Sequence, residues 1–315
     1  MKIALSLALI AGSLFGVTQA PYPIAPGAAT GLDSANAAVD KYPDSEVDSP
    51  EDTLAYWTKE RMAQAVANSG AATAEGRSAA GSAGASAIDY AGRNPAVGVV
   101  FYQNSDGDDQ VCTGTVINDS AKNVVLTAGS CLHGGAGKDW SKKVAFAPEY
   151  SNGTAWRGLW AGSWMRAYHG WMDYGNAKYN QAAFRVWPNS QNQEIQNLVK
   201  AHKLMTVYSS SQSNIQAYSY RKQPGSPVEE PWYCEDAGSR GEPGQLATLG
   251  CRFPNPTAGG PWVKYIDAEG YGSIFAVSSS FRFDGGDTYL PEAYVNPDNL
   301  QSEIVDKLKK VGSTA

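Results

Sequence analysis

Short apolar segments alternate with turn residues from about residue 94 to about residue 295 of this 315-residue chain. The segments are rich in Val, Ile, Tyr and Phe, and they are separated by Gly, Asn, Asp and Ser. This pattern is typical of β-strands, and no strand–helix–strand rhythm indicates a parallel α/β sheet. We therefore predict an all-β domain, a barrel or a sandwich. The expected strands include residues 97–102, 111–117, 123–128, 143–147, 182–186, 215–220, 262–265 and 274–278.

Helical patterns occur near the two ends of the chain. Ser49 is a favourable N-cap, Pro50 suits the first helical position, and two acidic residues follow. We predict a helix over about residues 49–67. A second helix is predicted to begin at residues 296–298 and to close the chain. The apolar positions at helical spacing are Leu54, Trp57, Met62 and Val66 in the first helix, and Leu300, Ile304, Val305 and Leu308 in the second.

The first 88 residues differ in composition from the rest of the chain. Residues 1–20 have the form of a secretory signal peptide, with Lys2 before a short apolar core and a small-residue cleavage site. Residues 21–48 are rich in Pro, Ala, Gly and Asp without periodicity, which predicts an unstructured lead-in. Residues 69–87 are almost entirely Ala, Gly and Ser, which predicts a flexible linker. We therefore expect a secreted, extracellular protein with an N-terminal extension over residues 21–88.

Composition narrows the class of partner. Only 18% of the residues are charged, and the chain has 33 Gly, 17 Tyr and 9 Trp, as suits a β-rich extracellular protein. The net charge of -6 argues against nucleic acid and anionic membrane surfaces as main partners. After the signal peptide no stretch supplies the roughly twenty apolar residues of a membrane anchor. We expect an extracellular protein as the partner, with carbohydrate as the alternative.

The four cysteines of an exported chain indicate two disulfides. Four cysteines allow three pairings, and we favour the two local ones. Each closes a short loop, which the chain-entropy model associates with about 3 kcal/mol of stabilisation. A zinc site is the rival interpretation, but no Cys-x-x-Cys occurs and the histidines are scattered, so we expect no metal and no cofactor. The favoured pairs are Cys112–Cys131 and Cys234–Cys251.

Three further patterns have local interpretations. Asn118 and Asn152 begin glycosylation sequons, which predict a glycoprotein in a host that glycosylates its exported proteins. The acidic string at residues 106–109 is interpreted as a hairpin turn rather than a calcium loop, because the remaining calcium-loop spacing is missing. Aromatic residues crowd residues 156–171, where strand side chains that cover a barrel are favoured over a sugar-binding platform. These aromatic residues are Trp156, Trp160, Trp164, Tyr168 and Trp171.

Two strings carry a family resemblance. Residues 112–117 read Cys-Thr-Gly-Thr-Val-Ile, and residues 127–131 read Thr-Ala-Gly-Ser-Cys. Together they resemble the segment of chymotrypsin- and trypsin-like serine peptidases that carries the catalytic histidine, and both cysteines fit the family's disulfide. The match is closest to secreted actinobacterial members, which have a helix similar to residues 56–62 before the peptidase domain. The histidine position is Ser130, whose hydroxyl cannot act as a general base near neutral pH.

A second segment resembles the nucleophile loop of the same family. Residues 255–262 read Asn-Pro-Thr-Ala-Gly-Gly-Pro-Trp, where the family has Gly-x-Ser-Gly-Gly-Pro. The nucleophile position is Ala258, which has no hydroxyl. The position that supplies an oxyanion-hole N–H is Pro256, which has none to donate.

The third part of the triad is matched more weakly. Residues 179–184 have the shape of the family's Tyr-Asp-x-(Ala/Gly) string, with Asn180 at the aspartate position. An amide cannot stabilise an imidazolium as a carboxylate does. His133 lies one helical turn beyond Ser130, but relatives with the intact histidine also carry a His here, so we do not expect it to replace the base.

The resemblance implies two packed antiparallel β-barrels, with an N-terminal helical extension and a C-terminal helix. It covers residues 89–315, and the boundary between the barrels is expected near residues 190–205. With base, orienter, nucleophile and one oxyanion donor all replaced, we predict a pseudoprotease that is not an enzyme and acts by protein binding as an inhibitor, decoy or adaptor. The alternative is a secreted serine-type endopeptidase or other hydrolase with a rearranged active site. A carbohydrate-binding wall or matrix protein is a third interpretation.

Overall fold

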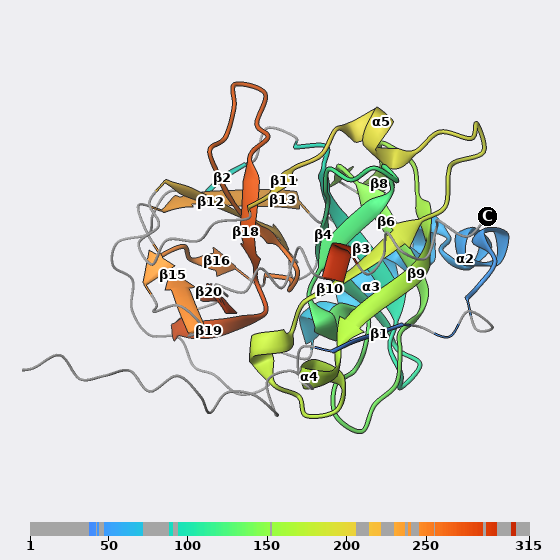
Figure 1. Ribbon diagram of the computed structural model, residues 1–315, viewed down its shortest axis with the longest axis horizontal. Coiled ribbons are helices and arrows are strands. Elements are labelled where there is room, and N and C mark those ends of the chain that lie inside the picture. Colours follow the sequence, from blue (N-terminus) through green and yellow to red (C-terminus); the bar gives the residue numbers. More distant parts are fainter. Residues whose placement is uncertain are drawn as a thin grey trace, which may run out of the picture.

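The computed structural model describes residues 38–41, 43, 47–71, 88–90, 94–151, 153–205, 214–221, 230–236, 239–240, 246–254, 256–285, 288–294 and 304–306. The described chain is mostly β-structure arranged in two halves, with the first half in green and the second in orange in Figure 1. The signal peptide predicted at residues 1–20 lies outside the described residues. No helix among the described residues is long and apolar enough to cross a membrane.

The first half is a closed barrel. Its sheet runs in the order β9-β10-β5-β4-β3-β6, and an additional pairing of β6 with β9 closes the ring. All of these pairings are antiparallel. The barrel strands are β3 (Val97–Gln103), β4 (Asp109–Val116), β5 (Val124–Thr127), β6 (Lys142–Pro148), β9 (Trp160–Tyr168) and β10 (Ala182–Val186), and a small hairpin joins β7 (Tyr150–Ser151) to β8 (Thr154–Ala155).

Both faces of the barrel strands are buried. Along β3, Val97, Val99 and Phe101 belong to a cluster that lies outside the barrel, whereas Val100 and Tyr102 belong to a second cluster with the β4 and β5 side chains inside it. Because successive side chains on a strand point to opposite faces, this alternation separates an interior core from an outer layer. The outer layer needs a cover, which the N-terminal helices and the second half of the chain supply.

The second half consists of two further sheets. One has the order β11-β18-β17-β12-β13-β2, and the other β14-β15-β20-β16 with β19 beside β20. All pairings are antiparallel except β11 with β18, so the prediction of two packed antiparallel barrels is confirmed with one parallel exception. The strands are β2 (Ile88–Tyr90), β11 (Lys203–Leu204), β12 (Ile215–Arg221), β13 (Glu230–Asp236), β14 (Ser239–Arg240), β15 (Leu246–Leu249), β16 (Phe253–Pro254), β17 (Pro261–Lys264), β18 (Ser273–Val277), β19 (Ser280–Gly285) and β20 (Thr288–Tyr294).

Both local disulfides are present. Cys112 in β4 is joined to Cys131 with 6.1 Å between the two Cα atoms, and Cys234 in β13 is joined to Cys251 with 5.8 Å between theirs. The first lies inside the first barrel and the second in the core of the second half. The prediction of local pairing is therefore confirmed.

The N-terminal extension differs from its prediction in two ways. In place of one helix over residues 49–67, the structure has α2 (Pro50–Tyr56), capped by the Ser49 side chain, and α3 (Lys59–Ala71). The helix breaks at Trp57, whose indole turns into the core instead of continuing the helical stripe. The predicted lead-in over residues 21–48 is also partly wrong, because β1 (Val39–Lys41) pairs with β9. The pairing with β9 satisfies backbone N–H and C=O groups of β1. The sequence of this segment has no strand periodicity from which the pairing could be predicted.

Two predicted segments remain, the boundary between the halves and the C-terminal helix. The predicted boundary at residues 190–205 contains α5 (Ile195–Val199) and β11. Residues 304–306 are helical, and Ile304 and Val305 are buried in the outer layer of the first barrel. The rest of the predicted C-terminal helix lies outside the described residues.

Candidate functional site at the junction of the two halves

Ser130 lies at the inner edge of the first barrel. It is the middle residue of a 3₁₀ turn, η2 (Gly129–Cys131), which follows β5 almost directly. The disulfide from Cys131 to Cys112 ties this turn to β4. The Ser130 N–H donates to Asn180 Oδ1 at 2.7 Å, whereas its hydroxyl makes no hydrogen bond among the described residues. The position predicted for the catalytic histidine is therefore held beside the position predicted for the aspartate.

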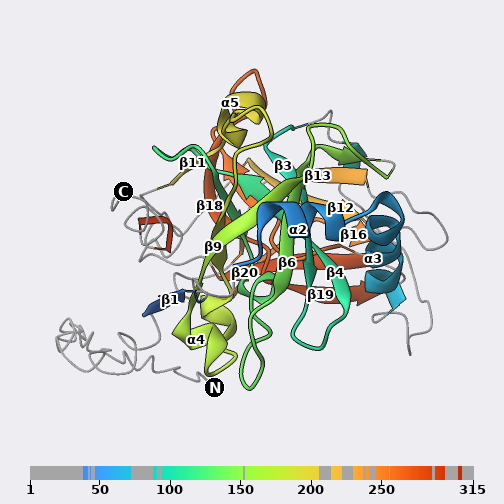
Figure 2. The same ribbon diagram turned by 90° about the vertical axis from the view of Figure 1, so that its right-hand side faces the viewer.

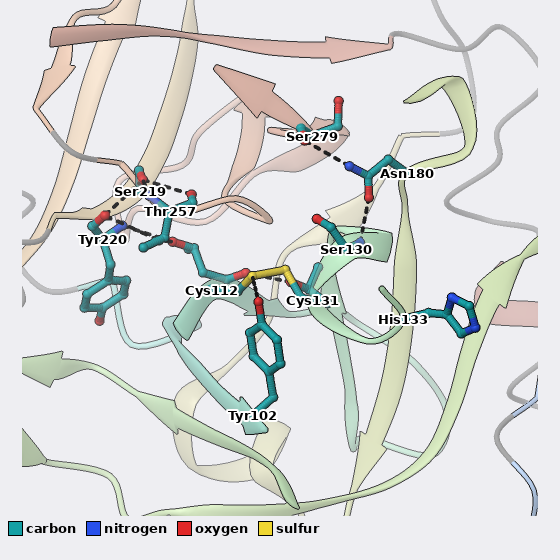
Figure 3. Close-up of a disulfide and its surroundings, with 12 residues drawn as sticks. Tyr102, Cys112, Ser130, Cys131, His133, Asn180, Ser219, Tyr220, Thr257 and Ser279 are labelled. Carbon is teal, nitrogen blue, oxygen red and sulfur yellow. Dashed lines mark hydrogen bonds between the residues drawn. A yellow bond between two sulfur atoms is a disulfide. The ribbon is translucent and has the colours of Figure 1, made fainter. Parts of the chain in front are cut away.

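Asn180 joins the two halves of the molecule. It lies between a second 3₁₀ turn, η3 (Ala177–Tyr179), and β10, and only 4% of it is exposed. Its amide nitrogen donates to the backbone carbonyl of Ser279 at 2.9 Å, from the second half of the chain. Figure 3 shows the resulting chain from Ser130 through Asn180 to Ser279. Because Ser130 N–H can only donate and the Ser279 carbonyl can only accept, the orientation of this amide is fixed by its partners.

The loop that carries Ala258 presses against the first barrel. The Ala258 carbonyl accepts a hydrogen bond from the Thr113 N–H at 2.7 Å. Gly259 has φ +90, and a Cβ on it would lie 2.2 Å from the Thr113 carbonyl oxygen and 3.0 Å from the Ala128 nitrogen, so this contact requires glycine. Ala128 is two residues before Ser130. The fold thus brings the predicted positions Ser130, Asn180 and Ala258 to one junction.

Thr257 holds this loop in place by buried hydrogen bonds. It is 3% exposed, and its hydroxyl lies 2.5 Å from the Thr113 hydroxyl. Its N–H donates to Ser219 Oγ at 3.0 Å and to the Tyr220 carbonyl at 3.2 Å. The Thr113 hydroxyl in turn accepts from the Tyr220 N–H at 3.0 Å. The Thr257 hydroxyl therefore serves the contact between the two halves, and Figure 3 shows it directed away from Ser130.

The backbone N–H groups of the loop that carries Ala258 differ in whether they make hydrogen bonds. The Thr257 N–H is bonded as described above, and the Ala258 N–H makes no hydrogen bond among the described residues. Pro256 has no N–H, and the neighbouring Asn255 lies outside the described residues. The loop thus offers one N–H donor where an oxyanion hole uses two.

The histidine nearest to Ser130 is engaged elsewhere. His133 is 7% exposed, its Nδ1 accepts from the Gly135 N–H at 3.1 Å, and its ring packs edge-on against Trp140. Figure 3 shows this ring pointing away from Ser130 and Asn180. Burial lowers the pKa of His133 and keeps it neutral. His169 is paired with Asp173 at 2.8 Å at the surface of α4 (His169–Met172).

His202 is buried in the connection between the halves. It is 0% exposed, and its Nδ1 accepts from the Gly272 N–H at 3.1 Å, while Nε2 lies 3.1 Å from the Asn94 amide nitrogen. Burial lowers its pKa from 6.5 to about 4, against smaller opposing effects of the Gly272 hydrogen bond and of Asp267. This imidazole is a neutral structural group rather than a catalytic one.

We expect His202 to make the protein acid-sensitive. The unfolded chain takes up a proton near pH 6.5 and the folded chain only near pH 4, so the free energy of unfolding falls as the pH falls through this window. The expected loss between pH 7 and pH 5 is about 2 kcal/mol. Urea unfolding at both pH values should show that His202→Gln removes most of this loss. Equal pH dependence in parent and His202→Gln would contradict the assignment.

The remaining sequence-predicted sites have structural roles or stay predictions. The acidic turn is closed by Asn104, whose side chain accepts from the Asp106 and Asp108 N–H groups, and Asp106 pairs with Lys138 at 2.7 Å. No group of described residues could hold a metal ion. Asn118 is exposed and accepts from Gln196, whereas the Asn152 sequon position lies outside the described residues, so glycosylation stays a prediction.

The aromatic segment lies mainly on the barrel. Trp160 and Tyr168 are buried in β9, Trp164 is half-buried, and Trp156 is 52% exposed. Trp171 lies on α4, and its indole N–H donates to the His133 carbonyl at 2.9 Å. Sequence reasoning missed Trp171 and Ser279 as parts of the junction, because neither has a motif and both reach it only through long-range packing.

Comparisons with solved structures identify the fold. A thermostable serine protease, AL20, from an extremophilic microorganism shares 22% identity, covers 68% of this chain and 98% of its own, with a TM-score of 0.59. The protease Anisep from Arthrobacter nicotinovorans shares 21% identity over 69% of this chain and 96% of its own, with a TM-score of 0.59. A Glu endopeptidase shares 18% identity over 70% and 92%, with a TM-score of 0.54.

The fold is that of chymotrypsin-like serine proteases. No family model and no curated protein matches the sequence. The prediction that the chain is not an enzyme is wrong as it was made, because the solved structures that share its fold are proteases.

Proposed function

We propose that this chain is secreted and acts by binding another extracellular protein at the junction of its two halves, as an inhibitor, decoy or adaptor. The observation that supports this proposal is the arrangement of the junction itself. The serine-protease fold places Ser130, Asn180 and Ala258 together there, yet their side chains are short and neutral. Under this proposal the surface around these three positions serves recognition.

Two features support a surface built for binding. Asn180 and Thr257 tie the halves together by hydrogen bonds from both sides of the junction, so the surface is preorganised. Preorganisation reduces the ordering cost of association. The two disulfides fit an oxidising, extracellular location.

Affinity capture from the host's culture medium tests the proposal. We expect Ala258→Arg to reduce recovery of the captured protein at least about tenfold, because a long cation at a half-buried central position blocks contact with a neutral surface. The matched control is Ser190→Arg, on an exposed turn after β10. Both variants should keep the parent's thermal midpoint. Equal recovery with both variants would place the binding surface elsewhere.

The second candidate is a serine-type endopeptidase with a rearranged active site. The protease identity of the similar structures favours it, and the Ser130 hydroxyl, which makes no hydrogen bond among the described residues, is the nucleophile it would use. Labelling by a fluorophosphonate probe that maps to Ser130 and disappears in Ser130→Ala would establish this candidate. Labelling at another serine would favour this candidate with that serine as the nucleophile, whereas no labelling would leave the binding proposal as the better supported one.

A further inference from the structure

The N-terminal extension is packed into the body of the molecule. Trp57 is 3% exposed, its ring centre lies 5.4 Å from that of Phe101 in β3, and its indole N–H donates to the Lys143 carbonyl at 2.5 Å. Met62, Ala65 and Val66 of α3 are buried in the same outer layer of the first barrel. Figure 2 shows α2 in front of the strands of this barrel, and α3 lies at its side, where it contacts β4. These side chains supply the cover that the outward face of β3 and β4 needs.

Polar contacts hold the same segment in register. The Asp109 carboxylate accepts from the Tyr56 hydroxyl at 2.6 Å and from Arg61 Nε at 2.6 Å. The Arg61 guanidinium also lies 3.8 Å from the centre of the Tyr56 ring. At the start of α2, the Asp48 carboxylate binds both the backbone N–H and the ammonium group of Lys143. Charge-assisted contacts are therefore made both at the start of α2 and at the junction of α2 and α3.

The first strand of the extension reaches toward the candidate site. β1 pairs with β9 up to Tyr168, and the Ala38 carbonyl accepts from the His169 N–H at 2.9 Å, at the start of α4. Trp171 of α4 then supports the Ser130 turn. A Cβ on Gly129 would lie 2.9 Å from the Trp171 ring, and the Trp171 indole holds the His133 carbonyl.

We propose that the described residues between 38 and 67, which we call the strap, are a resident part of the first barrel and position the Ser130 turn through α4. The strap covers apolar surface of the barrel that would otherwise be exposed. Its first strand, β1, fixes the position of the segment that carries Trp171. We use the word tether for the Ala-, Gly- and Ser-rich residues 72–87, which follow α3 in the sequence and lie outside the described residues. Cleavage of the tether, which contains Arg77, leaves the strap bound.

Cleavage of the tether in the otherwise unchanged protein is the test. Residues 78–84 are replaced by the recognition sequence of a site-specific endoprotease, the folded protein is cut, and the product is passed over a sizing column. We expect the strap fragment to co-elute with the barrels and to remain bound on dilution. Release of the strap, with both barrels still folded by circular dichroism, would show that it is a removable pro-segment and would overturn the proposal.

Two variants of the cleavable protein measure what holds the strap. Trp57→Ala should raise the strap's dissociation rate at least about 100-fold, because it empties a buried site. The matched control is Leu54→Ala in the same helix, whose side chain is 41% exposed and which should change that rate less than about threefold. If Trp57→Ala does not fold, Arg61→Ala removes one contact to Asp109 and should raise the rate severalfold. Equal rates in all variants would contradict a packed strap.

Coupling to the Ser130 turn has its own readout. We expect backbone hydrogen exchange at residues 129–133 to accelerate at least about tenfold when the strap is displaced by Trp57→Ala in the cut protein, while β17 remains protected. An unchanged exchange rate at the turn, with the strap demonstrably released, would remove the positioning role and leave only the barrel cover.

Discussion

Replacing Asn180 with aspartate should destabilise this protein by about 3 kcal/mol at pH 7, although the two side chains have nearly the same size. The Asn180 amide donates to the Ser279 carbonyl at 2.9 Å, and only 4% of the residue is exposed. An ionised carboxylate has no hydrogen to donate, so one of its oxygens would face the carbonyl oxygen. Two buried acceptor oxygens that face each other with no proton between them cost more free energy of folding than the loss of the hydrogen bond alone.

The same reasoning gives this variant a distinctive pH dependence. Once protonated, the introduced carboxyl group can donate its O–H to the Ser279 carbonyl, so folding should favour the protonated form and raise the pKa of this carboxyl above its unfolded value of about 3.9. The penalty relative to the parent should then vanish below about pH 4 and grow as the pH rises. Urea unfolding of the parent and of Asn180→Asp, from below pH 4 to pH 7, measures this difference in the free energy of unfolding.

The control for Asn180→Asp is Asn176→Asp. The Asn176 side chain is exposed, and its oxygen accepts from the Lys178 N–H at 3.0 Å as the cap of η3. A carboxylate serves as well as an amide where only an acceptor is needed, so we expect a change below about 0.5 kcal/mol. An equally small effect of Asn180→Asp at pH 7 would mean that the amide is not the tie between the two halves.

Pro256 should limit any attempt to install serine-protease chemistry at this site. The changes Ser130→His, Asn180→Asp and Ala258→Ser supply base, orienter and nucleophile, and the Ala258 N–H is available as one oxyanion donor. Pro256 withholds the second, and losing one such donor costs about 10²–10³ in rate in enzymes where it has been measured. Proline also fixes its own φ and restricts the preceding residue, which shapes the loop.

Adding Pro256→Gly to these three changes should therefore raise the rate of acylation by an activated ester at least about 100-fold. Burst kinetics on the pair of variants measure the difference. Because Asn180→Asp is expected to destabilise the fold, the same pair is also made with Asn180 retained, and Pro188→Gly serves as a control for proline removal elsewhere. Equal burst rates with and without Pro256→Gly would show that Pro256 is not at the oxyanion position.

Local patterns in the sequence were sufficient for the eight strands named from them and for the two disulfides. Strands such as β10 (Ala182–Val186) match the predicted range because β-branched and apolar residues bounded by turn signals specify a strand by themselves. The local pairs Cys112–Cys131 and Cys234–Cys251 follow the same logic, since short loops close at small entropic cost. The N-cap predicted at Ser49 is a further local signal, and in the structure the Ser49 side chain accepts from the Asp52 N–H.

Only the tertiary structure decided which polar groups meet. Asn180 receives its second partner from Ser279, 99 residues further along the chain, and the partner is a backbone carbonyl, which no side-chain pattern can announce. The break between α2 and α3 likewise follows from Trp57 filling a site beside Phe101. Helical periodicity is a local property, whereas burial of one large ring against a distant strand is a property of the assembled barrel, and here the second outweighed the first.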